Sequence, residues 1–170
     1  GFALLEPMRV LGIDPGLQIT GYGVIEDGGG APVVLEAGVI RTTSGHDMSL
    51  RLHELSCEIK GVIEQFRPDI IAVEELYSHY GHPRTAIIMG HARGIVFLKA
   101  AEAGVAVVPY ASTRIKKSLT GNGRASKRQM QMMIRSALHL PRPPEPPDAA
   151  DALAVALCHC RAAAHHEVAV

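Results

Sequence analysis

The chain has 170 residues, 47 % of them hydrophobic, and its 17 basic residues balance its 17 acidic ones. This composition excludes a disordered chain and this length excludes two large domains, so we expect a single domain over residues 8–165, with residues 1–7 as an N-terminal extension or a vector-derived remnant. The sequence has no apolar run of roughly 18 residues and no recognisable signal peptide, so no membrane partner is expected. Its three cysteines suit a reducing compartment, and the chain is therefore expected to be cytoplasmic.

Three strands are expected first, over residues 8–14, 20–27 and 32–42, and the glycine run at 28–30 forms the turn between the last two. An amphipathic helix follows over residues 48–66 and ends before Pro68. The residues of this helix expected to face inward are Leu50, Leu52, Leu55, Ile59, Val62, Ile63 and Phe66.

The second half of the chain alternates strands with helices and then becomes helical. Residues 84–103 predict a long helix whose Gly90, Ala92 and Gly94 would let another element approach closely. The remaining elements are strands at 69–76 and 104–110, basic helices at about 111–119 and 125–138, a proline-rich connector, and a last helix at 148–160. The order βββαβαβααα predicts an α/β fold.

Four carboxylates stand at the ends of these core elements. Asp14 ends the almost wholly apolar first strand and Glu74 ends another strand, while Asp148 and Asp151 share one face of the last helix. Such a cluster is unfavourable alone, because like charges raise each other's pKa, and a divalent cation such as Mg²⁺ removes the repulsion. Two ions about 4 Å apart activate a water and stabilise the leaving oxygen in phosphodiester hydrolysis.

Each carboxylate also has a simpler explanation. Asp14 precedes Pro15-Gly16 and suits a turn, Glu74 suits a solvated strand end, and Asp148 suits a helix N-cap. Asp151, the only polar residue of AADALAVAL, faces solvent or favours the helix N-terminus electrostatically. Taken together, the four fit a metal site better than four coincidences.

Basic residues are concentrated in one segment. Residues 103–144 contain no acidic residue, which suggests an anionic partner, although a solvated basic face is the simpler alternative. The eight basic residues of this segment are Arg114, Lys116, Lys117, Arg124, Lys127, Arg128, Arg135 and Arg142.

These motifs together resemble a known family. GIDPG followed by TGYGVI, then AVEEL, RIKKSLTGNGRASKRQMQ and DAADALAVAL, is similar over about residues 8–160 to the bacterial RuvC Holliday-junction resolvases. The resemblance implies an RNase H-like fold, a five-stranded mixed sheet flanked by helices on both sides. It also implies a homodimeric, structure-selective endonuclease that nicks four-way DNA junctions in recombination and repair, uses two Mg²⁺ ions per site (or Mn²⁺ in their place), and works with the branch-migration proteins RuvA and RuvB.

The resemblance also implies roles for individual residues. The family's catalytic and metal-binding quartet falls on Asp14, Glu74, Asp148 and Asp151, with Glu74 favoured over its neighbour Glu75. Residues matching family contacts with DNA are Lys116, Lys127 and Tyr77, and Arg84 is a further candidate. The alternative for Tyr77 is a half-buried residue at a strand end, and the loop 78–84 differs from the family, so its contacts are not carried over.

Three other functions are compatible with parts of the pattern. An actin-like or sugar-kinase ATPase also uses an Asp-X-Gly turn near phosphate, but it needs a second lobe that 170 residues cannot supply. A non-catalytic relative would have lost some of the carboxylates, and another RNase H-like nuclease would keep them.

Cys158-His159-Cys160 has poor spacing for zinc on a helix, so we expect packing roles there.

Overall fold

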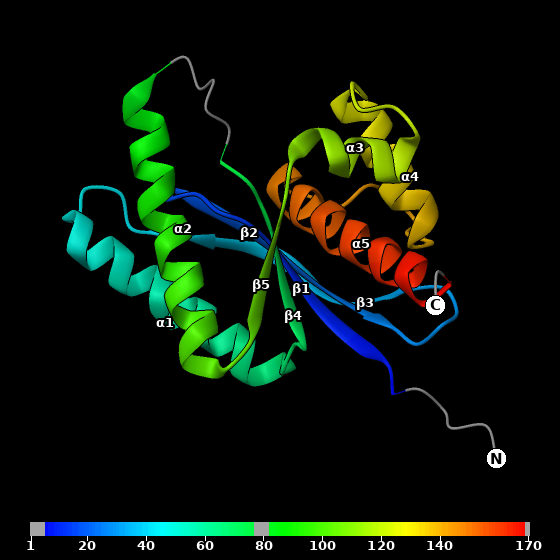
Figure 1. The fold of residues 1–170 in the computed structure, drawn as a ribbon. Coiled ribbons are helices and arrows are strands. Elements are labelled where there is room, and N and C mark those ends of the chain that lie inside the picture. Colours follow the sequence, from blue (N-terminus) through cyan, green and yellow to red (C-terminus); the bar gives the residue numbers. More distant parts are fainter. Residues whose placement is uncertain (1–5, 77–81, 169–170) are drawn as a thin grey trace.

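A five-stranded sheet runs through the middle of the molecule, with helices on both faces (Figure 1). The computed structural model describes residues 6–76 and 82–168. The strand order is β3-β2-β1-β4-β5, antiparallel from β3 to β1 and parallel from β1 to β5. The expected mixed sheet is therefore confirmed. The strands are β1 (Met8–Asp14), β2 (Ile19–Asp27), β3 (Val33–Arg41), β4 (Ile70–Glu74) and β5 (Ala106–Tyr110).

The helices divide between the two faces of the sheet. Helices α1 (Met48–Phe66) and α2 (Pro83–Ala103) cover one face. The opposite face carries α3 (Ser112–Thr120), α4 (Lys127–Ala137) and α5 (Pro147–Val168) (Figure 1). Within the described residues, none of these helices has both the length and the apolar character needed to cross a membrane.

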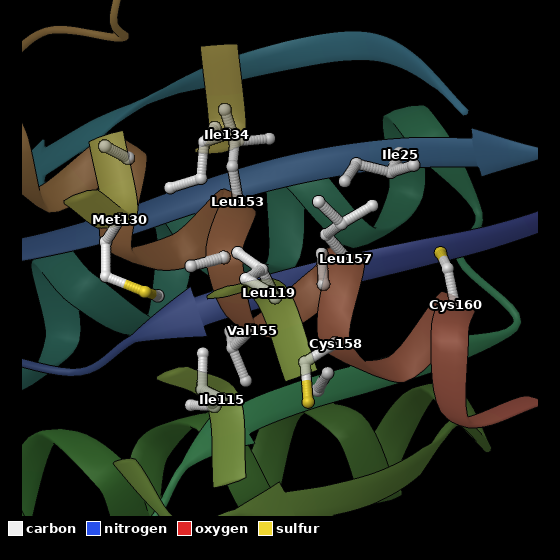
Figure 2. Close-up of a cluster of buried hydrophobic side chains, with 14 of the residues drawn as sticks. Ile25, Ile115, Leu119, Met130, Ile134, Leu153, Val155, Leu157, Cys158 and Cys160 are labelled. Atoms are coloured by element: carbon white, nitrogen blue, oxygen red, sulfur yellow. The ribbon is translucent and has the colours of Figure 1, made fainter. Parts of the chain in front are cut away.

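Strand β1 supplies both cores because successive side chains of a strand point to opposite faces. Val10 packs with the helices α3, α4 and α5, whereas Leu11 and Ile13 pack with α1 and α2. All three side chains are at most 1 % exposed. Figure 2 shows the first of these cores, where side chains of α5 such as Leu153 and Leu157 lie among those of α3, α4 and β2. The nearly continuous apolar run of β1 follows from burial on both faces.

Helix α5 lies directly against the backbone of the sheet. A methyl group placed on Gly12 would overlap the carbonyl oxygen of Ala152, and one on Gly21 would overlap that of Asp148. These two glycines therefore permit a contact that any side chain would block. This close contact fixes the height of α5 above β1 and β2.

Two expectations about helices were wrong in part. Leu50 was expected to face inward but is 52 % exposed, because the start of α1 extends beyond the sheet (Figure 1), and burial begins at Leu55. The last helix continues to Val168 instead of ending at residue 160, since the following Arg161 and the three alanines after it favour helix.

Among the described residues, the close approach expected along this helix occurs at Ala92, which is buried, and not at Gly90 or Gly94. In the part of the chain that the structure describes, an added methyl group on Gly94 would meet nothing within 4 Å, and one on Gly90 would only touch Leu76 at 3.9 Å.

Candidate active site

Three core elements bring the four predicted carboxylates toward one point. Strands β1 and β4 are parallel neighbours, with Ile13 opposite Val73, so their last residues, Asp14 and Glu74, leave the sheet at the same edge. Asp14 is also paired with Gly21 of β2, and Gly21 is the residue that touches the backbone of Asp148. The sheet register and the glycine contact therefore place the start of α5 beside the ends of β1 and β4.

The charges of these carboxylates act on one another. Burial raises the pKa of Asp14 to about 8, and the negative charges of Asp151, Glu74 and Asp148 add to this effect in that order. The positive charge of Lys127 opposes it. Asp14 is therefore protonated at neutral pH unless additional positive charge stands beside it.

Burial is also the main cause of the raised pKa values of Glu74 and Asp151. For Glu74, the charge of Asp151 acts in the same direction, while a hydrogen bond with Ser112 and the charges of Lys116 and Lys127 oppose it. For Asp151, the strongest opposing influence is Lys127, whose Nζ lies 3.6 Å from Oδ2 of Asp151.

A cavity of about 190 Å³ opens between these groups. Glu74 and Asp151 line it together with Lys116, Lys127 and Ser112. The two lysines come from α3 and α4, so the acid-free segment supplies positive charge directly to the acidic site. Sequence reasoning did not single out Ser112, because a serine at a helix start carries no distinctive signal.

The donor atoms at this site fit a divalent cation. Carboxylate oxygens are the ligands that Mg²⁺ and Mn²⁺ prefer, and after burial the negative charges of three neighbouring carboxylates contribute to the raised pKa of Asp14. Within residues 6–76 and 82–168, no group of three or more His, Cys, Asp or Glu side chains is already gathered at metal-binding spacing. Carboxylates that repel one another are expected to stay apart when no cation lies between them.

The structure places the other predicted residues as follows. Glu75 is exposed, and its backbone N–H donates a hydrogen bond to the carbonyl of Tyr110 at 2.9 Å, so Glu74 and not Glu75 faces the acidic cluster. Arg84 is an exposed residue in the first turn of α2 and does not line the cavity.

The predicted DNA contact Tyr77 lies outside the described residues. Cys158 and Cys160 are buried, as expected of packing residues.

An acidic site at the carboxyl edge of a five-stranded mixed sheet, with helices on both faces, defines a protein of the RNase H-like class. The model of the family described as crossover junction endodeoxyribonuclease RuvC matches residues 10–159. The chain belongs to this family.

Curated relatives agree with this assignment. The chain is 49 % identical over 149 residues to a protein of Rhodopirellula baltica named crossover junction endodeoxyribonuclease RuvC, a match that covers 88 % of this chain and 84 % of the relative. A protein of the same name from Pelotomaculum thermopropionicum is 43 % identical, with 94 % of each chain covered.

Solved structures are similar over nearly the whole chain. The structure of Thermus thermophilus RuvC has a TM-score of 0.87 and 36 % identity, covering 94 % of this chain and 97 % of that one. The T. thermophilus RuvC structure in complex with a Holliday junction substrate gives the same TM-score and identity, with 92 % and 94 % covered. A yeast mitochondrial Holliday junction resolvase shares the fold at a TM-score of 0.64 and 14 % identity, covering 94 % of this chain and 82 % of the resolvase.

Proposed function

We propose that this chain is a structure-selective endonuclease that resolves four-way DNA junctions by paired nicks, in homologous recombination and DNA repair. The observation that carries the proposal is the convergence of Asp14, Glu74, Asp148 and Asp151 at one edge of the sheet, where burial and, after it, the charges of the other three raise the pKa of Asp14. Support comes from the T. thermophilus RuvC structure with a Holliday junction substrate. This family membership favours a junction nuclease over an ATPase or a nuclease acting on RNA–DNA hybrids.

The four carboxylates would hold two Mg²⁺ ions, with Mn²⁺ able to replace them. When bound, such ions activate a water and stabilise the leaving oxygen of a phosphodiester. The chain's own part is to hold its carboxylates on rigid elements, because misplacing reacting groups by about 1 Å costs about 10²-fold in rate. Two of the carboxylates end strands of the sheet and two stand on α5, which is fixed against the sheet backbone by Gly12 and Gly21.

The two lysines of the cavity would attract and orient the scissile phosphate. Lys127 lies 3.6 Å from Asp151 and Lys116 faces the same cavity, so both carry positive charge to the place where a phosphate must sit. Ser112 hydrogen-bonds to Glu74 and helps to keep that carboxylate charged and in place. Tyr77 would stack on splayed bases at the junction centre, and Arg84 would contact DNA at the start of α2.

A two-fold symmetric enzyme suits the paired nicks. Two opposed strands of a junction need two active sites, and a C2 homodimer supplies them. The branch-migration proteins RuvA and RuvB are the partners that the family relationship implies.

The test is the nicking of a synthetic four-way junction in Mg²⁺ or Mn²⁺, with the cut positions mapped on all strands. Asp151→Asn keeps the size of the side chain but removes a charge from the site, so nicking is expected to fall by at least about 10²-fold while junction binding survives. The matched control is Asp47→Asn, which makes the same change at the exposed N-cap of α1. Wild-type nicking by Asp151→Asn would overturn the proposal. Cleavage of RNA–DNA hybrids but not of junctions would favour another RNase H-like nuclease.

A further inference from the structure

A second cavity, of about 370 Å³, lies between α3 and α5, farther along α5 than the acidic site. Side chains from both helices line it: Arg114, Lys117 and Ser118 from α3, and Cys158, Arg161 and His165 from α5. On α3, Lys116 turns to the acidic cavity while Arg114 and Lys117 turn to this one. The sequence alone did not separate these two groups of basic residues.

Helical periodicity gathers the positive charge. Residues 114 and 117 are three apart on α3, and residues 161 and 165 are four apart on α5, so each pair shares a helix face. The two faces meet across the cavity, and no acidic side chain of the described residues lines it. An anion would therefore meet two guanidinium groups, an ammonium group and an imidazole without a competing carboxylate.

Both guanidinium groups are held in place by the fold. Arg161 donates from Nη1 to the carbonyl oxygens of Ser118 at 2.7 Å and of Leu119 at 3.4 Å, near the end of α3. Arg114 lies with its Cζ 4.9 Å from the centre of the Tyr110 ring, a cation–π contact. A guanidinium has five N–H donors, so these contacts leave further donors for a ligand.

Cys158, which lines the cavity, is affected by the charges of both guanidinium groups. Cys158 is only 1 % exposed, and burial raises the pKa of its thiol. A hydrogen bond with Ser118 and the charges of Arg114 and Arg161 oppose that effect. The charges of Arg114 and Arg161 therefore both act on the same wall of the cavity, the one that Cys158 lines.

We infer that this cavity binds a backbone phosphate of a duplex arm of the DNA substrate, away from the bond that is cut. Arginine and lysine are the usual partners of phosphate, and the planar fork of arginine suits two of its oxygens. The distance from Asp151 to Arg161 along the axis of α5 is about 15 Å, because an α-helix rises 1.5 Å per residue. An arm that leaves the acidic site along α5 would reach this cavity. The inference rests on the proposed function, because it takes the ligand to be the same DNA.

The test is the salt dependence of junction binding in Lys117→Ala, measured without divalent cations. Each lost phosphate contact lowers the slope of log affinity against log salt by about 0.9. The affinity lost between about 50 and 200 mM salt should thus be about threefold smaller than in the wild type. Nicking by saturating enzyme should stay unchanged, since Lys117 does not line the acidic cavity. The matched control, Lys60→Ala, removes an exposed lysine from α1 across the sheet and should leave the slope unchanged.

The outcomes separate this inference from the proposed function. If the wild type binds and nicks the junction but Lys117→Ala keeps its affinity and its salt slope, the phosphate site is wrong and an acidic protein segment becomes the better occupant. If the wild type neither binds nor nicks the junction, the proposed function fails, and inorganic phosphate then tests the cavity by itself. Phosphate should shift the guanidinium NMR signals of Arg114 and Arg161, less so in Lys117→Ala, and unmoved signals would overturn the inference.

Discussion

Asp14 has the most unfavourable environment of the four carboxylates. Its side chain combines burial with the charges of three other acids, and the charge of Lys127 opposes them. A side chain chosen for stability alone would be apolar here, as Val10, Leu11 and Ile13 of the same strand are. The carboxylate costs stability at the place where the proposed chemistry requires it.

This cost predicts a pH dependence of stability in the protein without metal. In the unfolded chain Asp14 titrates near pH 4, whereas in the folded chain its pKa is about 8. Between these values the folded state holds a proton that the unfolded state lacks, so stability falls as pH rises through this window. Urea unfolding in EDTA should therefore show lower stability at about pH 8 than at about pH 5. Asp14→Asn should flatten this trend, and parallel curves for the two proteins would contradict the pKa.

Sequence reasoning singled out the charged residues of the candidate site but not the residues that support them. Asp14 and Glu74 were visible because each follows a run of apolar residues, and a charge at such a place is informative by itself. Ser112 and Arg161 were missed because their roles depend on which residues lie opposite them. Glu74 and Ser112 are brought together by the pairing of β4 with β5, and Arg161 reaches α3 only through the packing of α5.

At the scale of elements, the contact between α5 and the sheet controls the site. Gly21 is paired with Asp14 on one side and touches the backbone of Asp148 on the other. The spacing of the two backbone segments that carry Asp14 and Asp148 is thus set by backbone against backbone, a contact that no side-chain rearrangement can adjust.

Gly21→Ala should therefore affect activity more than binding. The added methyl group would overlap the carbonyl of Asp148 and push the start of α5 away from the sheet. We expect a loss of about 1–3 kcal/mol in the free energy of unfolding and a fall of at least about tenfold in nicking. Junction binding, which we propose depends on the basic residues, should be retained.

The matched control is Gly61→Ala, at an exposed position of α1 where a methyl group meets nothing within 4 Å. It should be stabilising by up to about 1 kcal/mol, because alanine favours helix. Equal effects of both variants on nicking would remove the special role of Gly21. Urea unfolding and the junction assay measure the two quantities separately.

The elements themselves were largely predictable. The helix at 48–66 was placed correctly because an apolar face repeats along it and Pro68 prevents its continuation. Helix α5 gives no such signal at its N-terminal half, where every residue from Ala149 to Leu157 except Asp151 is buried. The sequence placed the end of this helix at residue 160, eight residues too early, because the residues that follow carry neither an apolar periodicity nor a terminator such as proline.

At the scale of the whole molecule, one face of α2 has no partner in the described chain. Ile87 is 62 % exposed and Leu98 is 51 % exposed, and an added methyl group on Gly94 would meet nothing within 4 Å. These residues are separated by seven and four positions, so they form one stripe along the helix. An apolar stripe with a glycine at its middle suits close packing against a second copy of the chain.

Leu98→Glu should therefore convert a dimer into a monomer in sedimentation at micromolar concentration. The control is Met132→Glu, which places the same charge at a residue of α4 that is 50 % exposed, and it should leave the dimer intact. The monomeric variant should cut one strand of a junction without pairing the two cuts. A wild type that sediments as a monomer, alone and with junction, would exclude the homodimer.

During translation, the residues of the candidate active site are made far apart in time, and the last of them come near the end of the chain. Asp14 lies in the first strand and Asp151 in the last helix, and Glu74 lies about midway between them. A ribosome makes the chain from its N-terminus at about 5–20 residues per second, so several seconds pass between the two aspartates. A nascent chain that ends before residue 148 lacks the α5 side of its core and carries only Asp14 and Glu74 of the four carboxylates. Under the proposed function, a polypeptide released before residue 148 would lack two of its four metal-binding carboxylates, so nicking would begin only after α5 has been made and has docked.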